Sequence, residues 1–162
     1  MTEIMSAPTI VACQLVSEVL QLSGRVRIRV LGDSMFPSIL PGDILVVERQ
    51  ELNQLHPGRI VLFTRNGRLF AHRVVGEHRR NDLRVLVTCG DSRRENDAPV
   101  FPHELLGCVT SIFRGQRRIS PRVTFLMQWV SWCTSRSDFL TRCLLWLIRS
   151  IRSRRALTEC LT

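Results

Sequence analysis

The sequence predicts an α+β fold: a mostly antiparallel β domain with a helix before it and a helical tail after it. Three observations predict this class. Apolar residues recur at helical spacing near the N-terminus, short runs rich in β-branched residues alternate with turn signals through the middle, and the C-terminal part mixes Trp, Leu and Arg at helical spacing. The 162 residues fit one globular domain with appendages. We therefore divide the chain into an N-terminal amphipathic helix (1–24), a central domain (25–113) and a basic helical tail (114–162).

The helix is predicted over residues 9–22, because Leu15 and Val19 share a helical face and a Ser-Gly pair supplies a stop. A sheet is predicted to begin directly afterwards, where Arg alternates with Val and Ile. Turn signals separate the later strands, and the pair Asn66-Gly67 is typical of a tight hairpin. The predicted strands are 25–30, 44–48, 59–64, 68–75, 83–88 and 105–113.

The positive charge lies in the tail. The chain has a net charge of +9, and all 23 of its basic residues are arginine. Residues 1–113 hold 13 Arg against 12 acidic residues (+1), whereas residues 114–162 hold 10 Arg against 2 acidic residues (+8). A nearly neutral body with a cationic, apolar tail favours an anionic membrane surface as a partner and argues against nucleic acid. The alternative is a pair of tail helices that pack on the sheet or on a second subunit.

No metal or cofactor is expected, because the six cysteines form no C-x-x-C motif and do not stand at zinc-ligand spacing with histidine. The segment 4–22 is interrupted by polar residues and follows Glu3, so we expect neither a cleavable signal peptide nor a membrane span there. The uncharged stretch 123–135 is too short to cross a bilayer. We expect a protein with reduced thiols that is cytoplasmic or peripherally membrane-associated through its Arg-rich tail.

The densest cluster of special residues runs from Gly32 to Asp43, directly after a predicted strand. Gly32 allows close approach of the backbone and Pro37 limits continuation of a helix. Ser34 is therefore expected at an exposed turn, with its own amide free to donate to a developing oxyanion. The alternative is an ordinary β-turn serine.

A serine hydroxyl needs a base, and without lysine the candidates are histidine and carboxylates. His72 lies inside an apolar strand, which can hold an imidazole rigidly, although it can equally be a structural histidine. A carboxylate that orients the imidazole is available from Asp91 or Asp97, in the loop that Gly90 begins, although turn formation also explains these residues. The remaining histidines adjoin prolines or charged residues and are expected at the surface: His56, His78 and His103.

Three motifs in order resemble the type I signal peptidases. They are G-D-S-M-x-P-x-[IL]-x-x-G-D, x-H-R-V-V and G-D-x(5)-D, and they are most similar to the endoplasmic-reticulum and archaeal branch, in which histidine replaces the bacterial lysine. The resemblance covers about residues 29–113 and implies a catalytic domain of signal-peptidase type. The self-cleaving repressors share this fold but use lysine and carry a DNA-binding domain.

Carried onto this chain, the resemblance implies that Ser34 is the nucleophile and His72 the general base. The supporting acid is Asp91 or Asp97, and Asp91 is the one we place in the catalytic set. Met35, next to the nucleophile, is expected to contact the substrate. Cys89 stands where the family usually has a lysine before the loop Gly-Asp, and we expect this change to be tolerated.

The predicted function is a serine endopeptidase that needs no cofactor and cleaves a peptide or protein precursor, bound as an added strand beside the Ser34 segment. The alternative is a noncatalytic peptide-binding or membrane-scaffold protein that keeps the peptidase fold. Substrate identity, the side of the membrane and the oligomeric state are left open by the sequence.

The charge distribution predicts binding to anionic vesicles, because each Arg near such a surface contributes about 1 kcal/mol. Deleting residues 121–162 should release the protein from these vesicles in a sedimentation assay and leave a soluble domain. Aggregation of the truncated chain would instead show that the tail covers part of the core.

Overall fold

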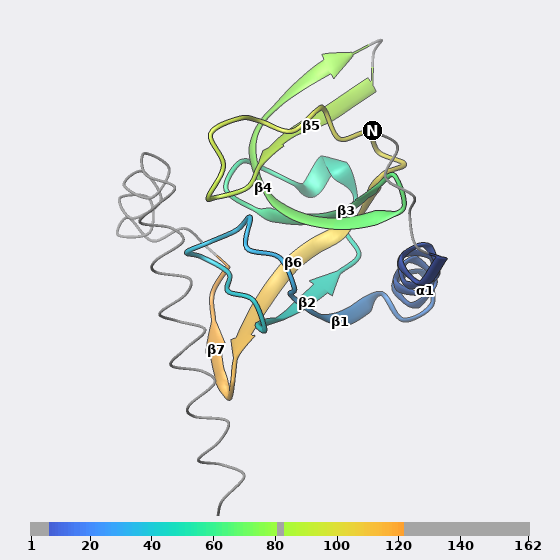
Figure 1. The fold of residues 1–162 in the computed structure, drawn as a ribbon. Helices are drawn as coiled ribbons and strands as arrows, with labels where there is room; N and C mark the ends of the chain where they lie inside the picture. Colours follow the sequence, from blue (N-terminus) through green and yellow to red (C-terminus); the bar gives the residue numbers. More distant parts are fainter. Residues whose placement is uncertain (1–6, 81–82, 122–162) are drawn as a thin grey trace, which may run out of the picture.

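The computed structural model describes residues 7–80 and 83–121 as one helix and one antiparallel sheet (Figure 1). The sheet order is β1-β2-β6-β3-β4-β5, and β7 also pairs with β6. This confirms the predicted antiparallel β domain with an N-terminal helix. Most of the predicted helical tail (114–162) lies outside the described residues, which end at residue 121. The elements are α1 (Ala7–Ser23), β1 (Arg25–Arg29), β2 (Ile44–Glu48), the short 3-10 helix η1 (Leu52–Gln54), β3 (Ile60–Arg65), β4 (Arg68–Arg80), β5 (Leu83–Cys89), β6 (Leu105–Arg114) and β7 (Arg117–Ile119).

Strand β6 joins the two parts of the sheet, because it pairs with β2, β3 and β7 (Figure 1). Its pairing with β2 shifts register at Val46/Val47. Gly107 of β6 packs against the backbone of β2, because a Cβ atom there would stand 2.5 Å from the carbonyl oxygen of Glu48. Only glycine therefore fits this crossing without moving backbone.

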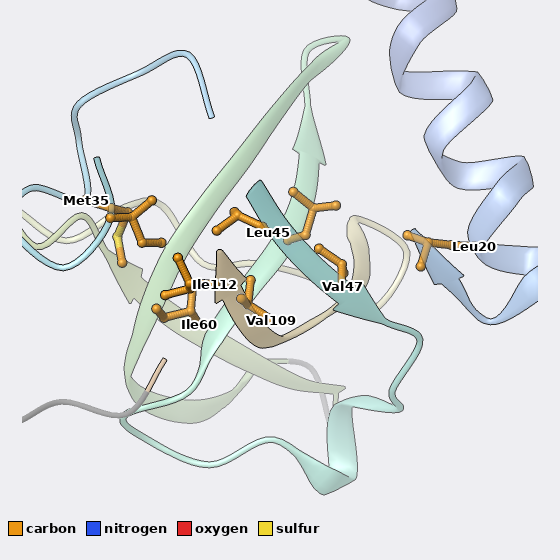
Figure 2. Close-up of a cluster of buried hydrophobic side chains, with 9 residues drawn as sticks. Leu20, Met35, Leu45, Val47, Ile60, Val109 and Ile112 are labelled. Atoms are coloured by element: carbon orange, nitrogen blue, oxygen red, sulfur yellow. The ribbon is translucent and has the colours of Figure 1, made fainter. Parts of the chain in front are cut away.

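Both faces of the sheet are buried, which the alternation along β3 shows. Ile60 and Leu62 belong to one apolar cluster, and Val61 and Phe63 belong to a second cluster on the other face. Figure 2 shows the first cluster, where side chains from the sheet meet Leu20 of α1 and Met35 of the loop after β1. We call this first cluster the main core; the segment that carries Ser34 is thus fixed to it.

The sheet extends beyond the predicted strands at two places. Strand β4 continues past residue 75, because a register shift between Val74 and Gly76 absorbs one residue and lets the β4–β5 hairpin pair as far as Arg80↔Leu83. Strand β7 lies beyond residue 113, in the part assigned to the tail, and pairs with the end of β6 after a turn at Gly115 (φ 62°). Its sequence holds two arginines and one isoleucine, so it lacks the apolar alternation that marks a strand.

An ion pair fastens the end of β3 to the connection before β6. Arg65 donates from Nε and Nη2 to the two carboxylate oxygens of Glu104, each at 2.8 Å, and also donates to the carbonyl oxygens of Ala98 and Pro99. The Arg65 hydrogen bond is the main reason that the pKa of Glu104 is lowered, and the amide of Phe101 adds to the effect. The charged form of Glu104 therefore stabilises the folded state.

Glu104→Gln should lower the free energy of unfolding at neutral pH. A carboxyl pKa that is depressed in the folded state adds stability above the pKa of the unfolded chain, and this stability is lost as the pH falls through the folded-state pKa. The difference between wild type and Glu104→Gln, measured by urea denaturation, should therefore shrink towards acidic pH. Glu51→Gln is the control, because the Glu51 side chain is exposed and makes no capping bond to η1. A difference that stays constant with pH would contradict this account.

Candidate active site

Ser34 lies in the loop between β1 and β2, which a buried carboxylate closes. Asp43 is fully buried; its Oδ2 accepts the amide of Leu40 at 2.8 Å and Nη2 of Arg114 at 2.8 Å. Its backbone carbonyl accepts the amide of Val30 at 2.9 Å, so the two ends of the loop are tied together. With Met35 held in the core, these bonds leave Ser34 at a fixed turn.

His72 lies on β4 and is only 1% exposed. The rings of Phe63 and Phe70 meet its imidazole edge-on, with centroids 6.0 and 5.9 Å away. Nε2 of His72 lies 3.0 Å from Oγ of Ser34, and Nδ1 lies 2.6 Å from Oδ2 of Asp97. The aromatic contacts and the two hydrogen bonds together fix the orientation of the imidazole between a hydroxyl and a carboxylate.

Asp97 reaches His72 because Thr88 holds it. The Thr88 hydroxyl donates to Oδ2 of Asp97 at 2.7 Å, and the amide of Asp97 donates to the Thr88 carbonyl oxygen at 2.8 Å. Thr88 is fully buried at the end of β5. The sequence analysis did not single out Thr88. The only feature of the sequence that could have indicated its role is its position just before the Cys-Gly-Asp loop.

Asp91 does not contact His72, unlike its assignment from the sequence. Its carboxylate forms a bidentate pair with Arg73, with Nε–Oδ1 at 2.8 Å and Nη2–Oδ2 at 2.7 Å. Arg73 is 7% exposed and also donates to the carbonyl oxygens of Gly58 and Pro121 and to the hydroxyl of Ser38. The buried Arg73 guanidinium pairs with Asp91, the first aspartate of the loop. Asp97 is the aspartate that lies beside the His72 imidazole. Sequence reasoning missed Arg73, although it directly follows His72.

The loop after β5 supports the backbone of the nucleophile. The amide and hydroxyl of Ser92 donate to the Ser34 carbonyl oxygen at 3.0 and 2.9 Å. Gly90 packs directly against it: a Cβ atom on Gly90 would lie 2.6 Å from this oxygen and 3.3 Å from Nε2 of His72. Any side chain at Gly90 would push the serine and the histidine apart.

A cavity of about 650 Å³ begins at Ser34. Residues 28–35 line one wall and residues 68–71, at the start of β4, line the other. The floor is apolar and includes Ile39, Leu45 and Leu62 from the main core. The cavity therefore lies between two extended segments, and Ser34 is part of its lining; we call it the slot.

Met35 has two environments, because it is 4% exposed in the main core and also lines the cavity. The helix α1 contributes Ala12 and Cys13 to the lining of the slot. The Cys13 thiol donates to the carbonyl oxygen of Gly67 at 3.0 Å, which ties α1 to the hairpin between β3 and β4. The N-terminal helix thus forms part of the wall of the slot.

Cys89 is held inside the loop rather than exposed to the cavity's reactive end. Its thiol contacts the carbonyl oxygen of Glu95 at 3.2 Å. Burial is the main cause that raises the thiol pKa, and the nearby Asp97 and Asp91 raise it further. A protonated thiol is a poor nucleophile, so Ser34 is the better candidate in this neighbourhood.

The other predicted surface residues are confirmed: His56, His78 and His103 are exposed. Within residues 7–80 and 83–121, no group of three or more His, Cys, Asp or Glu side chains is arranged to hold a metal ion. In the same ranges, no helix has both the length and the apolar composition to cross a membrane.

A family model matches the segment that carries Ser34 and His72. The Peptidase S24-like family model matches residues 12–86, which ends before the loop that holds the two aspartates. The signal peptidase complex catalytic subunit SEC11 of Candida tropicalis is 35% identical over 74 residues, and the match covers 44% of this chain and 44% of that protein. The aligned part therefore spans less than half the length of this relative. These likenesses support a resemblance to the signal-peptidase-like proteases over this part of the chain.

Proposed function

We propose that this chain is a serine endopeptidase that cleaves a peptide or protein precursor through Ser34 and His72, with Asp97 as the supporting acid. The proposal depends on one observation: Oγ of Ser34, both ring nitrogens of His72 and the Asp97 carboxylate form a continuous row, with separations of 3.0 and 2.6 Å. A hydroxyl, an imidazole and a carboxylate in this order form a nucleophile, its base and the group that orients the base.

In the first step, Oγ of Ser34 attacks the carbonyl carbon of the scissile bond while Nε2 of His72 accepts the hydroxyl proton. Nδ1–H of His72 donates to Asp97, which keeps Nε2 free to accept and stabilises the imidazolium that forms. The tetrahedral intermediate collapses to an acyl-enzyme when His72 returns the proton to the leaving amine. Water then attacks the acyl group by the same route and releases Ser34.

The negative charge on the tetrahedral intermediate needs a donor. Among the described residues, the Ser34 amide donates to no backbone carbonyl, so it is available to the oxyanion. The Ser34 carbonyl, in contrast, is fixed by Ser92. This bond holds the peptide plane beside the nucleophile, and a donor that is already in place needs little reorganisation during the reaction.

The substrate is proposed to bind as an extended chain in the slot. Residues Arg68–Ala71 pair with β3 on one side, whereas β4 pairs with β5 only from Arg73 onward. Within the described residues, the second edge of this segment therefore has no strand partner and borders the cavity. A peptide added there would satisfy its main-chain groups and place its side chains over the apolar floor, which includes Met35. The Met35 contact with substrate stays a prediction.

A membrane surface stays a proposed partner as well. It depends on the excess of arginine in residues 114–162, most of which lie outside the described residues. The vesicle experiment on the truncated chain tests it.

Ser34→Ala should abolish labelling by a serine-reactive probe, and His72→Ala should lower peptide cleavage about 10²- to 10⁴-fold, the usual contribution of a positioned acid–base group. His78→Ala is the control, because His78 lies on the same strand and is exposed. Full activity in His72→Ala would exclude this mechanism, and peptide binding unaffected by both variants would favour the noncatalytic binding protein.

The different roles of Asp91 and Asp97 should appear when kcat and the free energy of unfolding are both measured for each Asp→Asn variant. Asp97→Asn should lower kcat about 10²- to 10⁴-fold with a small effect on stability, because it removes the support of the imidazolium. Asp91→Asn should destabilise the fold by about 3 kcal/mol, because it leaves the Arg73 guanidinium buried without its counter-charge. If Asp91→Asn lowers kcat in a fully folded protein while Asp97→Asn does not, the two roles are reversed.

A further inference from the structure

The carboxylate oxygen that meets His72 has a second donor on the neighbouring strand. Oδ2 of Asp97 lies 2.6 Å from Nδ1 of His72 and accepts the Thr88 hydroxyl at 2.7 Å. An ionised carboxylate only accepts hydrogen bonds, so the hydroxyl proton of Thr88 points to this oxygen. His72 lies on β4 and Thr88 lies on β5. One oxygen atom therefore connects the imidazole to the next strand of the sheet.

The register of the sheet places Thr88 and His72 on the same face. Thr88 is paired with Val74, which is two positions beyond His72 on β4. Side chains two positions apart on a strand share a face, and directly paired residues of neighbouring strands share it as well. Thr88 and His72 are thus diagonal neighbours, and the Asp97 carboxylate bridges them. Both are buried, with Thr88 0% and His72 1% exposed.

The backbone around Asp97 is held by other contacts. Its amide donates to the Thr88 carbonyl oxygen at 2.8 Å. The next two carbonyl groups, of Ala98 and Pro99, accept from Arg65 at 3.0 and 2.9 Å. These bonds position the backbone of Asp97 but do not set the torsions of its side chain. The Thr88 hydroxyl does so from β5, and a threonine suits this task because its branched Cβ makes the side chain stiff.

We propose that Thr88 is a positioning residue for the cleavage reaction, because its hydroxyl orients the Asp97 carboxylate towards His72. The inference rests on the proposed function, since it gives Thr88 a share in the transfer of the Ser34 proton. His72 accepts and returns a proton in both halves of the reaction, so a misdirected carboxylate slows both halves. Thr88 does not line the slot. Its hydroxyl should therefore affect the rate of the chemical steps and not the binding of the peptide.

Two matched pairs of variants isolate the hydroxyl of Thr88. Wild type and Thr88→Val differ in the hydroxyl at similar side-chain volume, and Thr88→Ser and Thr88→Ala differ in it at a smaller volume. The substrate is a peptide that the full-length wild-type protein cleaves, chosen by mass spectrometry from a digested proteome. Within each pair, loss of the hydroxyl should lower kcat and kcat/KM by the same factor, about tenfold to hundredfold. The second pair keeps the test decisive where Thr88→Val does not fold.

Thr110→Val is the control for the substitution itself. Thr110 is a half-buried residue of β6 that does not line the slot, and its hydroxyl contacts the carbonyl oxygen of Val46 at 3.5 Å. This variant should leave kcat unchanged. Circular dichroism at the assay temperature checks that each variant compared is folded.

A double-variant experiment distinguishes positioning from a merely structural role. In an Asp97→Asn background, loss of the Thr88 hydroxyl should change kcat far less than it does in the wild type, because the carboxylate through which Thr88 acts is already gone. A hydroxyl that supports only the fold would lower kcat by the same factor in both backgrounds. That result would overturn the proposal.

A serine-reactive probe, used in parallel, separates this inference from the proposed function. Protein that is labelled at Ser34 and keeps its full kcat in the variants without the hydroxyl would overturn the role of Thr88 and leave the proposed function intact. Wild-type protein that is not labelled and cleaves no peptide would overturn the proposed function, and the role of Thr88 with it.

Discussion

The arrangement of the site depends on one buried charge. Arg73 lies among residues that exclude water, where an unpaired guanidinium would be costly, so its donors must all find acceptors. The acceptors come from segments far apart in the sequence: Ser38 in the nucleophile loop, Asp91 in the loop after β5, and two carbonyl groups before β3 and after β7. Satisfying this one side chain therefore brings together the loops that carry the serine and the aspartate, next to the histidine on the same strand.

The nucleophile also depends on the packing of the fold. Ser34 is followed by Met35, which belongs to the main core. Ser92 donates to the carbonyl oxygen of Ser34. Gly90 packs against the same oxygen so closely that no side chain fits at position 90. A serine on a loop usually has freedom to change rotamer and position. Here the backbone on both sides is held, so the separation between Oγ and Nε2 follows from the packing rather than from the serine itself.

The sequence was sufficient to predict those features that depend on local patterns. The alternation of apolar residues and the turn signals predicted the first six strands. The motifs around Ser34 and His72, through their resemblance to the signal peptidases, predicted the pair that lies in contact. The choice between Asp91 and Asp97 depended on a contact between distant segments, because Arg73 occupies one of the two carboxylates and nothing in the sequence marks that arginine as buried. Strand β7 was missed for a similar reason: its pairing with β6, rather than its own composition, makes it a strand.

Among the described residues, the edge of β4 beside the slot has no strand partner, and this has a further consequence for how copies of the chain meet one another. An unpaired strand edge is a template for another strand, and proteins often protect such edges with charged residues. The outer strand β1 presents Arg25, Arg27 and Arg29 as its exposed positions, and the segment across the slot begins with Arg68. If two molecules approached along these edges, arginine would face arginine, and the repulsion would oppose sheet extension between them. The arginines along these edges therefore act against self-association.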